Sequence, residues 1–253
     1  MKINQTQYIF SGSVILVVGG EDDGYQSDSQ LSSLTRSCSN LQNYPITIQD
    51  ATGAIVSGHP IICGGHSVQD QQQNFQYHYH SECYHHNKAN NTWTFLTNMS
   101  TKRYLSASAP VKGKLLVLGG TGDGWNYLAT SEYVSPDGDA SQPGPDLPGP
   151  RYGHCAVKLA NGHVMLLGGL PDENKKSVII LHPDTGIDQS LPPLTFERRS
   201  FGCATFNSPM HDNREVVLAV GGLYQATAEV LDYSQPNPAW TTSNYYSFVY
   251  CFI

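Results

Sequence analysis

Five Gly-Gly pairs occur along this 253-residue chain, and each pair directly follows a run of apolar residues. The runs VILVV, PIIC, LLVL, VMLL and VLAV precede Gly19-Gly20, Gly64-Gly65, Gly119-Gly120, Gly168-Gly169 and Gly221-Gly222. The pairs lie 45, 55, 49 and 53 residues apart, a period typical of repeats that each form one small antiparallel sheet. We therefore expect a repetitive all-β fold in which these glycines are structural, because glycine lets two stretches of backbone pass closely.

Each repeat carries the signals of four antiparallel strands. A turn containing glycine, such as Asn161-Gly162-His163, precedes each of the first four apolar runs and supplies the positive φ of a tight hairpin. We expect first strands at residues 5–10, 46–55, 105–111, 153–159 and 201–206, and third strands at 81–84, 131–134, 177–181 and 228–231. Trp93 and Trp240 mark fourth strands, and an arginine then opens the next repeat at Arg103, Arg151 and Arg199.

This order of features resembles the Kelch repeat, in which an arginine, an inner strand, an apolar strand ending in Gly-Gly, a strand with Glu and Tyr, and a Trp follow one another. The resemblance covers essentially the whole chain, although the third and fourth repeats lack the Trp and the fourth lacks the Glu. It implies one Kelch-type β-propeller domain over residues 1–253, with about five four-stranded antiparallel blades. The expected blades are approximately 1–45, 46–99, 100–149, 150–197 and 198–253.

The number of blades raises the question of how the ring closes, since Kelch propellers usually contain six or seven. An open blade face of ~400 Å² would cost on the order of 10 kcal/mol. The ring must therefore close with five blades, pair with another chain, or continue in sequence absent here. We favour an incomplete six- or seven-bladed ring over a compact five-bladed one.

Six cysteines permit three disulfides. Cys155 and Cys203 each lie four residues after the arginine that opens their repeat, so a bridge between these inner strands is possible. Cys63 could pair with Cys83 on the neighbouring strand or with Cys38 across a blade interface. The alternative is a set of buried, reduced cysteines that pack as small apolar side chains.

The compartment is suggested by a narrower likeness. The stretch from Cys38 to Trp93 resembles secreted, cysteine-containing Kelch proteins of invertebrates, which implies an extracellular chain with disulfides; a cytoplasmic location is the alternative. Glycosylation sequons at Asn4, Asn90 and Asn98 would suit a secreted glycoprotein, but about two would occur by chance in a chain with this much Asn.

Charge and hydropathy exclude several classes of partner. The formal net charge is −7, and the chain has no basic cluster of the kind that binds nucleic acid or an anionic membrane surface. No apolar stretch is long enough for a transmembrane helix. We expect a protein partner, with no nucleic acid and no membrane insertion.

The residues with the clearest chemical potential are His78 and His80, which would lie on one face of a strand and could bind copper or zinc. Galactose oxidase, a copper enzyme, has Kelch-type blades, so a metal-dependent oxidoreductase is the alternative function. A polar surface loop is the simpler interpretation of this histidine-rich segment. Glu21, Asp22 and Asp23 likewise suggest a solvated turn. We therefore predict no catalytic residue, no metal site and no cofactor.

We expect a non-enzymatic scaffold that binds a protein, or a glycan, through loops on one propeller face. The candidate loops follow the glycine pairs, at residues 21–29, 66–74, 121–127, 171–176 and 223–226. Arg103, Arg151 and Arg199 could reach this face and bind acidic groups of the partner. Their alternative role is hydrogen bonding between blades.

Overall fold

The computed structural model describes residues 42–71, 74–123 and 126–244, together with the backbone of six strands in the N-terminal part. Gly19, Gly20, Asn4 and the side chain of Cys38 lie outside the described part. No helix among the described residues is long and apolar enough to cross a membrane.

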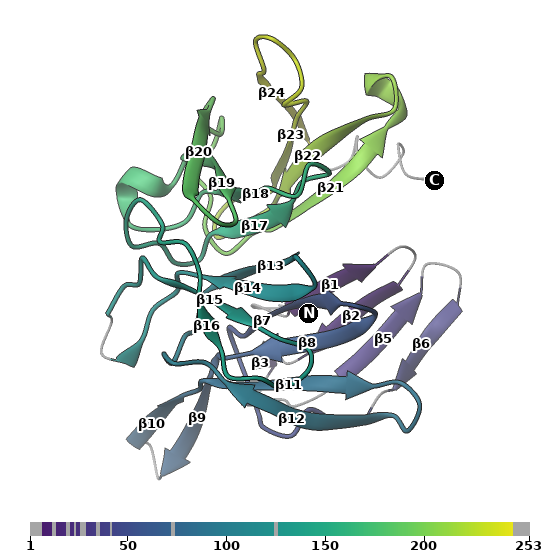
Figure 1. Ribbon diagram of the computed structural model, residues 1–253, viewed down its shortest axis with the longest axis vertical. Helices are drawn as coiled ribbons and strands as arrows, with labels where there is room; N and C mark the ends of the chain where they lie inside the picture. The colour runs from purple at the N-terminus through teal and green to yellow at the C-terminus, as the bar shows by residue number, and fades with distance from the viewer. Residues whose placement is uncertain are drawn as a thin grey trace.

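The chain forms five four-stranded antiparallel sheets, numbered here in chain order (Figure 1). Sheet 1 contains β1 (Gln7–Ser11), β2 (Val14–Val18), β5 (Ser29–Ser33) and β6 (Arg36–Asn40). Sheet 2 contains β7 (Thr52–Val56), β8 (His59–Cys63), β11 (Glu82–Asn87) and β12 (Thr92–Asn98). Sheet 3 contains β13 (Ala107–Val111), β14 (Lys114–Leu118), β15 (Ser131–Val134) and β16 (Gln142–Pro143).

The last two sheets repeat this meander. Sheet 4 contains β17 (Cys155–Lys158), β18 (Val164–Leu167), β19 (Val178–His182) and β20 (Gly186–Leu191). Sheet 5 contains β21 (Gly202–Ser208), β22 (Arg214–Val220), β23 (Thr227–Leu231) and β24 (Trp240–Asn244). Two hairpins, β3 (Glu21–Asp22) with β4 (Gly24–Tyr25) and β9 (His66–Gln71) with β10 (Asn74–Tyr79), and two 3-10 turns, η2 (Asp172–Asn174) and η3 (Pro209–His211), complete the described elements.

The predicted all-β fold with four-stranded antiparallel sheets is confirmed. The first strands β7 and β13 begin later than expected, because the residues before them form an irregular segment that bonds to neighbouring sheets. We call the residues directly before each innermost strand its lead-in segment. The third strand of sheet 2 also differs, since it runs over Glu82–Asn87 rather than 81–84.

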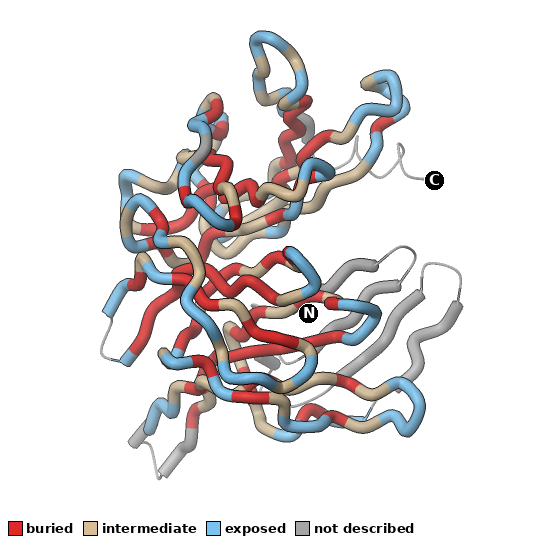
Figure 2. The backbone as a smooth tube through the Cα atoms, viewed as in Figure 1, coloured by how far each residue is buried: buried red, intermediate tan, exposed pale blue. Residues whose placement is uncertain are grey.

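Sheets 2 to 5 pack face to face in succession, so the apolar strands β8, β14 and β18 are buried on both sides (Figure 2). In β14, Leu115 and Val117 pack against sheet 2, whereas Leu116 and Leu118 pack against sheet 4. A third cluster joins Met165 and other residues of sheet 4 to sheet 5. This two-sided burial explains why the second strands are uninterrupted apolar runs.

The sheets are arranged around a common centre, in chain order from sheet 1 to sheet 5 (Figure 1). The innermost strands β1, β7, β13, β17 and β21 contact one another in succession, but β21 makes no comparable contact with β1. The architecture is therefore propeller-like, and closure between the first and fifth sheets is not seen among the described strands.

The glycine pairs of sheets 2, 3 and 4 directly follow the second strands, where another stretch of backbone passes very closely. A Cβ atom on Gly119 would lie 2.4 Å from the carbonyl oxygen of Arg151, and one on Gly64 would lie 2.3 Å from that of Arg103. Both glycines also have positive φ, at 58° and 68°. Any other residue would place its Cβ against one of these carbonyl oxygens, so only glycine fits. Each carbonyl belongs to the lead-in segment of the next sheet.

Candidate functional site

Four residues with left-handed backbone link the lead-in segments of sheets 2 to 5. Asp50, Leu105, Gly153 and Ser200 have φ values between 48° and 60°. The N–H groups of the last three donate to the carbonyl oxygen of the counterpart one sheet earlier, over 3.0, 2.8 and 2.7 Å from Leu105 to Ser200. We call these four residues the axial chain. Its hydrogen bonds align the lead-in segments of adjacent sheets, so residues at the same distance from the axial chain occupy equivalent positions in different sheets.

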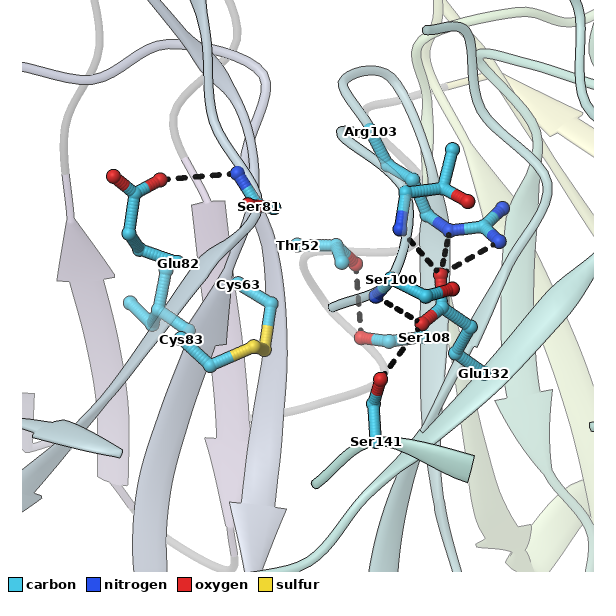
Figure 3. The surroundings of a disulfide bond; sticks show 12 residues. Thr52, Cys63, Ser81, Glu82, Cys83, Ser100, Arg103, Ser108, Glu132 and Ser141 are labelled. Atoms are coloured by element: carbon cyan, nitrogen blue, oxygen red, sulfur yellow. Dashed lines mark hydrogen bonds and ion pairs between the residues drawn. A yellow bond between two sulfur atoms is a disulfide. The ribbon is translucent and has the colours of Figure 1, made fainter. Parts of the chain in front are cut away.

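Two residues before the axial chain lie Arg103, Arg151 and Arg198, which are all buried. Arg103 donates from Nε and Nη2 to Glu132 on β15, and from Nη1 to the carbonyl oxygens of Gly119 and Thr130 (Figure 3). Arg198 contacts Glu229 of sheet 5 in the same way, with 2.7 Å between Nε and the carboxylate. Each guanidinium thus stabilises the sheet that follows its lead-in segment.

The prediction that Arg103 and Arg151 bind a partner is corrected by this geometry. Their exposed fractions are 1% and 2%, and their side chains bond inside sheets 3 and 4. Their backbone groups at the same time bond to the preceding sheet, as Gly65 N–H to Arg103 C=O and Gly120 N–H to Arg151 C=O. Hydrogen bonding between sheets, the alternative expected from the sequence, is what the two arginines do.

Arg199 differs from the other two predicted arginines. The buried equivalent of Arg103 in sheet 5 is Arg198, so Arg199 lies one position further along. Gln49, Tyr104 and Tyr152 occupy this same position in sheets 2, 3 and 4, directly before the axial chain. The Arg199 side chain is half-buried, and no described side chain accepts a hydrogen bond from its guanidinium or pairs with it. It is the predicted arginine that remains available to a ligand.

Two tyrosine pairs lie beside the axial chain. Tyr79, at the end of β10, stacks on Tyr104 with 4.9 Å between ring centroids, and Tyr127 stacks on Tyr152 at 4.6 Å. In each pair the first tyrosine comes from the loop after a glycine pair, and the second comes from the lead-in segment of the next sheet. We call these the axial tyrosine pairs.

The environments of Tyr104 and Tyr152 keep these two tyrosines protonated at neutral pH. Burial raises the pKa of Tyr104 to about 12. Burial and the neighbouring Tyr127 hydroxyl raise the pKa of Tyr152 to about 12, whereas the charge of Arg199 acts in the opposite direction. Tyr152 and Arg199 directly precede Gly153 and Ser200, which are joined by a backbone hydrogen bond of 2.7 Å, so the two residues occupy neighbouring positions beside the axial chain.

A buried histidine supports the first pair. His66 packs edge-on against Tyr104, with 5.3 Å between ring centroids, and its Nδ1 lies 3.4 Å from a carboxylate oxygen of Asp50. Burial, and then the nearby His80, lowers the pKa of His66 to about 4. His66 is therefore neutral at physiological pH and packs against Tyr104 as an uncharged ring.

His78 lies on β10 and His80 directly follows this strand, with 4.9 Å between their ring centroids. They lie at the end of the β9–β10 hairpin rather than in an unstructured loop. His80 contacts Ser67 through Nε2 and Glu82 through Nδ1. In the described part of the chain no three His, Cys, Asp or Glu side chains are grouped so as to hold a metal ion.

Two of the possible disulfides are present. Cys63 on β8 bonds to Cys83 on the adjacent β11, within sheet 2 (Figure 3). Cys155 on β17 bonds to Cys203 on β21, so this bridge joins the innermost strands of sheets 4 and 5. Disulfides form and persist in oxidising environments such as the extracellular space. Cys38 is not among the described side chains.

The axial tyrosine pairs were not predicted from the sequence. Tyr104 and Tyr152 each directly follow an arginine, so a repeated Arg-Tyr dipeptide was a visible signal. Their partners had no such signal, because Tyr79 lies fourteen residues after its glycine pair and Tyr127 lies seven residues after its own. Loops of unequal length hide structural equivalence from sequence spacing.

Comparison with known proteins supports the fold. No family model matches the chain, and no curated protein matches it. A solved structure described as "Structure of YjhT" is similar over 95% of this chain and 98% of that chain, with a TM-score of 0.68 and 10% sequence identity. At this level of identity the similarity shows that the two chains share a fold.

Proposed function

We propose that this protein is an extracellular binding scaffold whose ligand is an acidic segment of another protein. The observation that carries the proposal is the half-buried guanidinium of Arg199 beside the stacked Tyr127 and Tyr152. The equivalent residues in the two preceding sheets are tyrosines covered by a partner ring, whereas Arg199 is not stacked in this way. A guanidinium and an aromatic surface together suit a carboxylate carried on an apolar or aromatic neighbour.

Arg199 is also distinct from the structural arginines. Arg103 and Arg198 each bond to a glutamate of their own sheet, and so have no capacity for an external acid. Arg199 follows directly in sequence but contributes nothing comparable to the core. The two disulfides support an extracellular location, since such bonds are rare in the cytosol.

The proposal can be tested with a random peptide library displayed on phage and panned against the full-length chain. Enriched sequences are then synthesised and their affinity is measured by biolayer interferometry. We expect enrichment of Asp and Glu, and at least about tenfold weaker binding to Arg199→Ala, because a lost charge-assisted hydrogen bond is worth that much. Tyr127→Ala should weaken binding severalfold.

Lys88→Ala is the matched control, because it removes one positive charge from an exposed turn between β11 and β12. Its affinity for the selected peptides should equal that of the wild-type chain. Peptides without acidic residues, or peptides that bind equally to Arg199→Ala, would contradict the proposal.

A further inference from the structure

Three successive junctions between sheets are built on the same pair of backbone hydrogen bonds. The second glycine of each pair donates to the carbonyl oxygen of the next arginine: Gly65 to Arg103, Gly120 to Arg151 and Gly169 to Arg198, at 2.7, 2.8 and 2.8 Å. The N–H group of the same arginine donates to a loop carbonyl of the preceding sheet. These acceptors are His80, Leu128 and Lys175, at 3.1, 3.1 and 3.0 Å.

The residue before the loop acceptor adds an aromatic contact in two of the three junctions. Tyr79 precedes His80 and stacks on Tyr104, and Tyr127 precedes Leu128 and stacks on Tyr152. In such a junction, one sheet supplies a backbone donor, a backbone acceptor and an aromatic ring. The donor and acceptor bond to the backbone of an arginine from the next sheet, and the ring stacks on the aromatic residue that follows this arginine.

Sheet 5 carries all three groups at its own downstream side. Gln225 N–H donates to Gly222 C=O, as His80 does to Gly65 and Leu128 does to Gly120. This bond makes Tyr224 the structural equivalent of Tyr79 and Tyr127. Tyr224 is 91% exposed, whereas its equivalents are stacked.

The position of an incoming arginine is also open in sheet 5. A Cβ atom on Gly64, Gly119 or Gly168 would lie 2.3 to 2.6 Å from the carbonyl oxygen of the next arginine. On Gly221 it would find nothing closer among the described residues than Gln225 O, at 3.9 Å. The Gly222 N–H group has no hydrogen-bond acceptor in the described part of the chain.

We infer that Gly222, Tyr224 and Gln225 form a docking site for an extended segment of a partner protein, in which an aromatic residue directly follows the residue whose backbone is bound. The Gly222 N–H group donates to the carbonyl oxygen of the bound residue, Gln225 C=O accepts from its N–H group, and Tyr224 stacks on the aromatic side chain. The chemistry of the occupant is taken from the Arg103-Tyr104 and Arg151-Tyr152 lead-in segments, which fill the equivalent sites on sheets 2 and 3. This site adjoins Arg199, because Leu223 N–H donates to Arg199 C=O, but it uses other groups and does not bind an acid.

The test uses a synthetic peptide with the sequence of residues 100–111, labelled with a fluorophore, and the full-length chain. Fluorescence anisotropy should show saturable binding that the same peptide with Tyr104→Ala does not reproduce. Binding should become about threefold to tenfold weaker in Tyr224→Ala, the range expected for one aromatic stack. Tyr224→Phe should restore it, because the ring is retained.

Tyr77→Ala is the matched control, since Tyr77 is also exposed, at 59%, but lies on β10. It should bind the peptide as tightly as the wild-type chain does, and so should Arg199→Ala. Amide hydrogen exchange should show slower exchange at Gly222 when the peptide is bound. Absence of saturable binding, equal binding of the Tyr104→Ala peptide, or no effect of Tyr224→Ala would each overturn the inference.

Discussion

Sheets 3 and 5 each hold a buried arginine against a glutamate, whereas sheet 4 holds Arg151 with no carboxylate. In sheet 3, Glu132 accepts from Arg103, from the backbone N–H groups of Ser100 and Thr101, and from the hydroxyl of Ser141 (Figure 3). Burial alone would raise the pKa of Glu132, but these donors outweigh burial and hold it below its usual value. The glutamate is therefore ionised and pairs with the arginine.

Sheet 4 lacks both the glutamate that accepts these hydrogen bonds in sheet 3 and one of the backbone N–H groups that donate to it. The bond from Gly168 N–H to Ser177 C=O, equivalent to the bond from Gly119 to Thr130, places Ile179 where sheet 3 has Glu132. Three residues before Arg151 lies Pro148, which has no N–H group, whereas Ser100 donates from that position in sheet 3. A proline at this point leaves no donor unsatisfied when the glutamate is absent.

Arg151 keeps its charge with neutral acceptors instead. Its Nη1 donates to Gly168 C=O and its Nη2 donates to the side chains of Asn174 and Ser177. Its Nε has no acceptor among the described residues. Burial lowers the pKa of Arg151 to about 10, which still leaves it charged at neutral pH. The comparison shows that the arginine is retained for its backbone carbonyl contacts, with or without a glutamate.

The largest expected effect comes from making sheet 3 resemble sheet 4 at one residue only. Glu132→Leu leaves the buried Arg103 charge without its carboxylate and removes the acceptor of the Ser100 and Thr101 N–H groups. We expect the free energy of unfolding, measured by urea denaturation, to fall by about 3–5 kcal/mol. Leu replaces a group of similar volume, so a loss below about 1 kcal/mol would show that the pair is not a main support of this sheet.

The reverse change in sheet 4 should show that the proline and the isoleucine are coupled. Ile179→Glu alone should destabilise the chain, because it removes a buried apolar side chain and supplies an acceptor with too few donors. Adding Pro148→Ser provides the missing N–H group. We expect the free energy of unfolding of the double variant to be about 1–2 kcal/mol higher than the value obtained by adding the two single-variant changes.

The measurement for this prediction is a double-mutant cycle in urea. Strict additivity of Pro148→Ser and Ile179→Glu would contradict the proposed coupling. The cycle in sheet 3, with Ser100→Pro and Glu132→Ile, offers the matched comparison and should show coupling of the same sign.

The repeat and the strands could be predicted from the sequence because two-sided burial produces uninterrupted apolar runs, and close backbone approach requires glycine. Two disulfides were among the pairings left open, since equivalent positions in repeats imply proximity. Register was harder to predict. Glu82 is the only glutamate of the predicted third strand 81–84, but its carbonyl accepts from Gly64, which makes it the equivalent of Thr130 and not of Glu132.

The site was less predictable than the fold, for a physical reason. Arg198 and Arg199 are adjacent in sequence, and one is buried against Glu229 while the other is half-exposed. A shift of one residue in the lead-in segment exchanges these roles, and spacing from the glycine pairs is not accurate to one residue. The arginine prediction was accordingly wrong for Arg103 and Arg151 and remains a proposal for Arg199.

The smallest expected effect concerns the position directly after the axial chain, where sheet 4 has His154 and sheet 5 has Phe201. The His154 ring is buried, and neither ring nitrogen has a partner in the described part of the chain. Burial, and then the charge of Arg151, lowers the pKa of His154 well below its usual value. The unfolded chain therefore takes up a proton at higher pH than the folded chain, so stability falls as pH falls below about 6.5.

His154→Phe should change stability at about pH 7 by less than about 1 kcal/mol, because Phe201 shows that the ring fits this position. The variant lacks the proton uptake of His154, so its Tm should fall less than that of the wild-type chain between about pH 7 and about pH 5. Part of the pH dependence should remain, since the pKa of His66, His80 and His86 is also lowered by burial. Differential scanning calorimetry across this range checks the prediction, and identical pH dependence in the two chains would show that His154 is protonated equally well when folded.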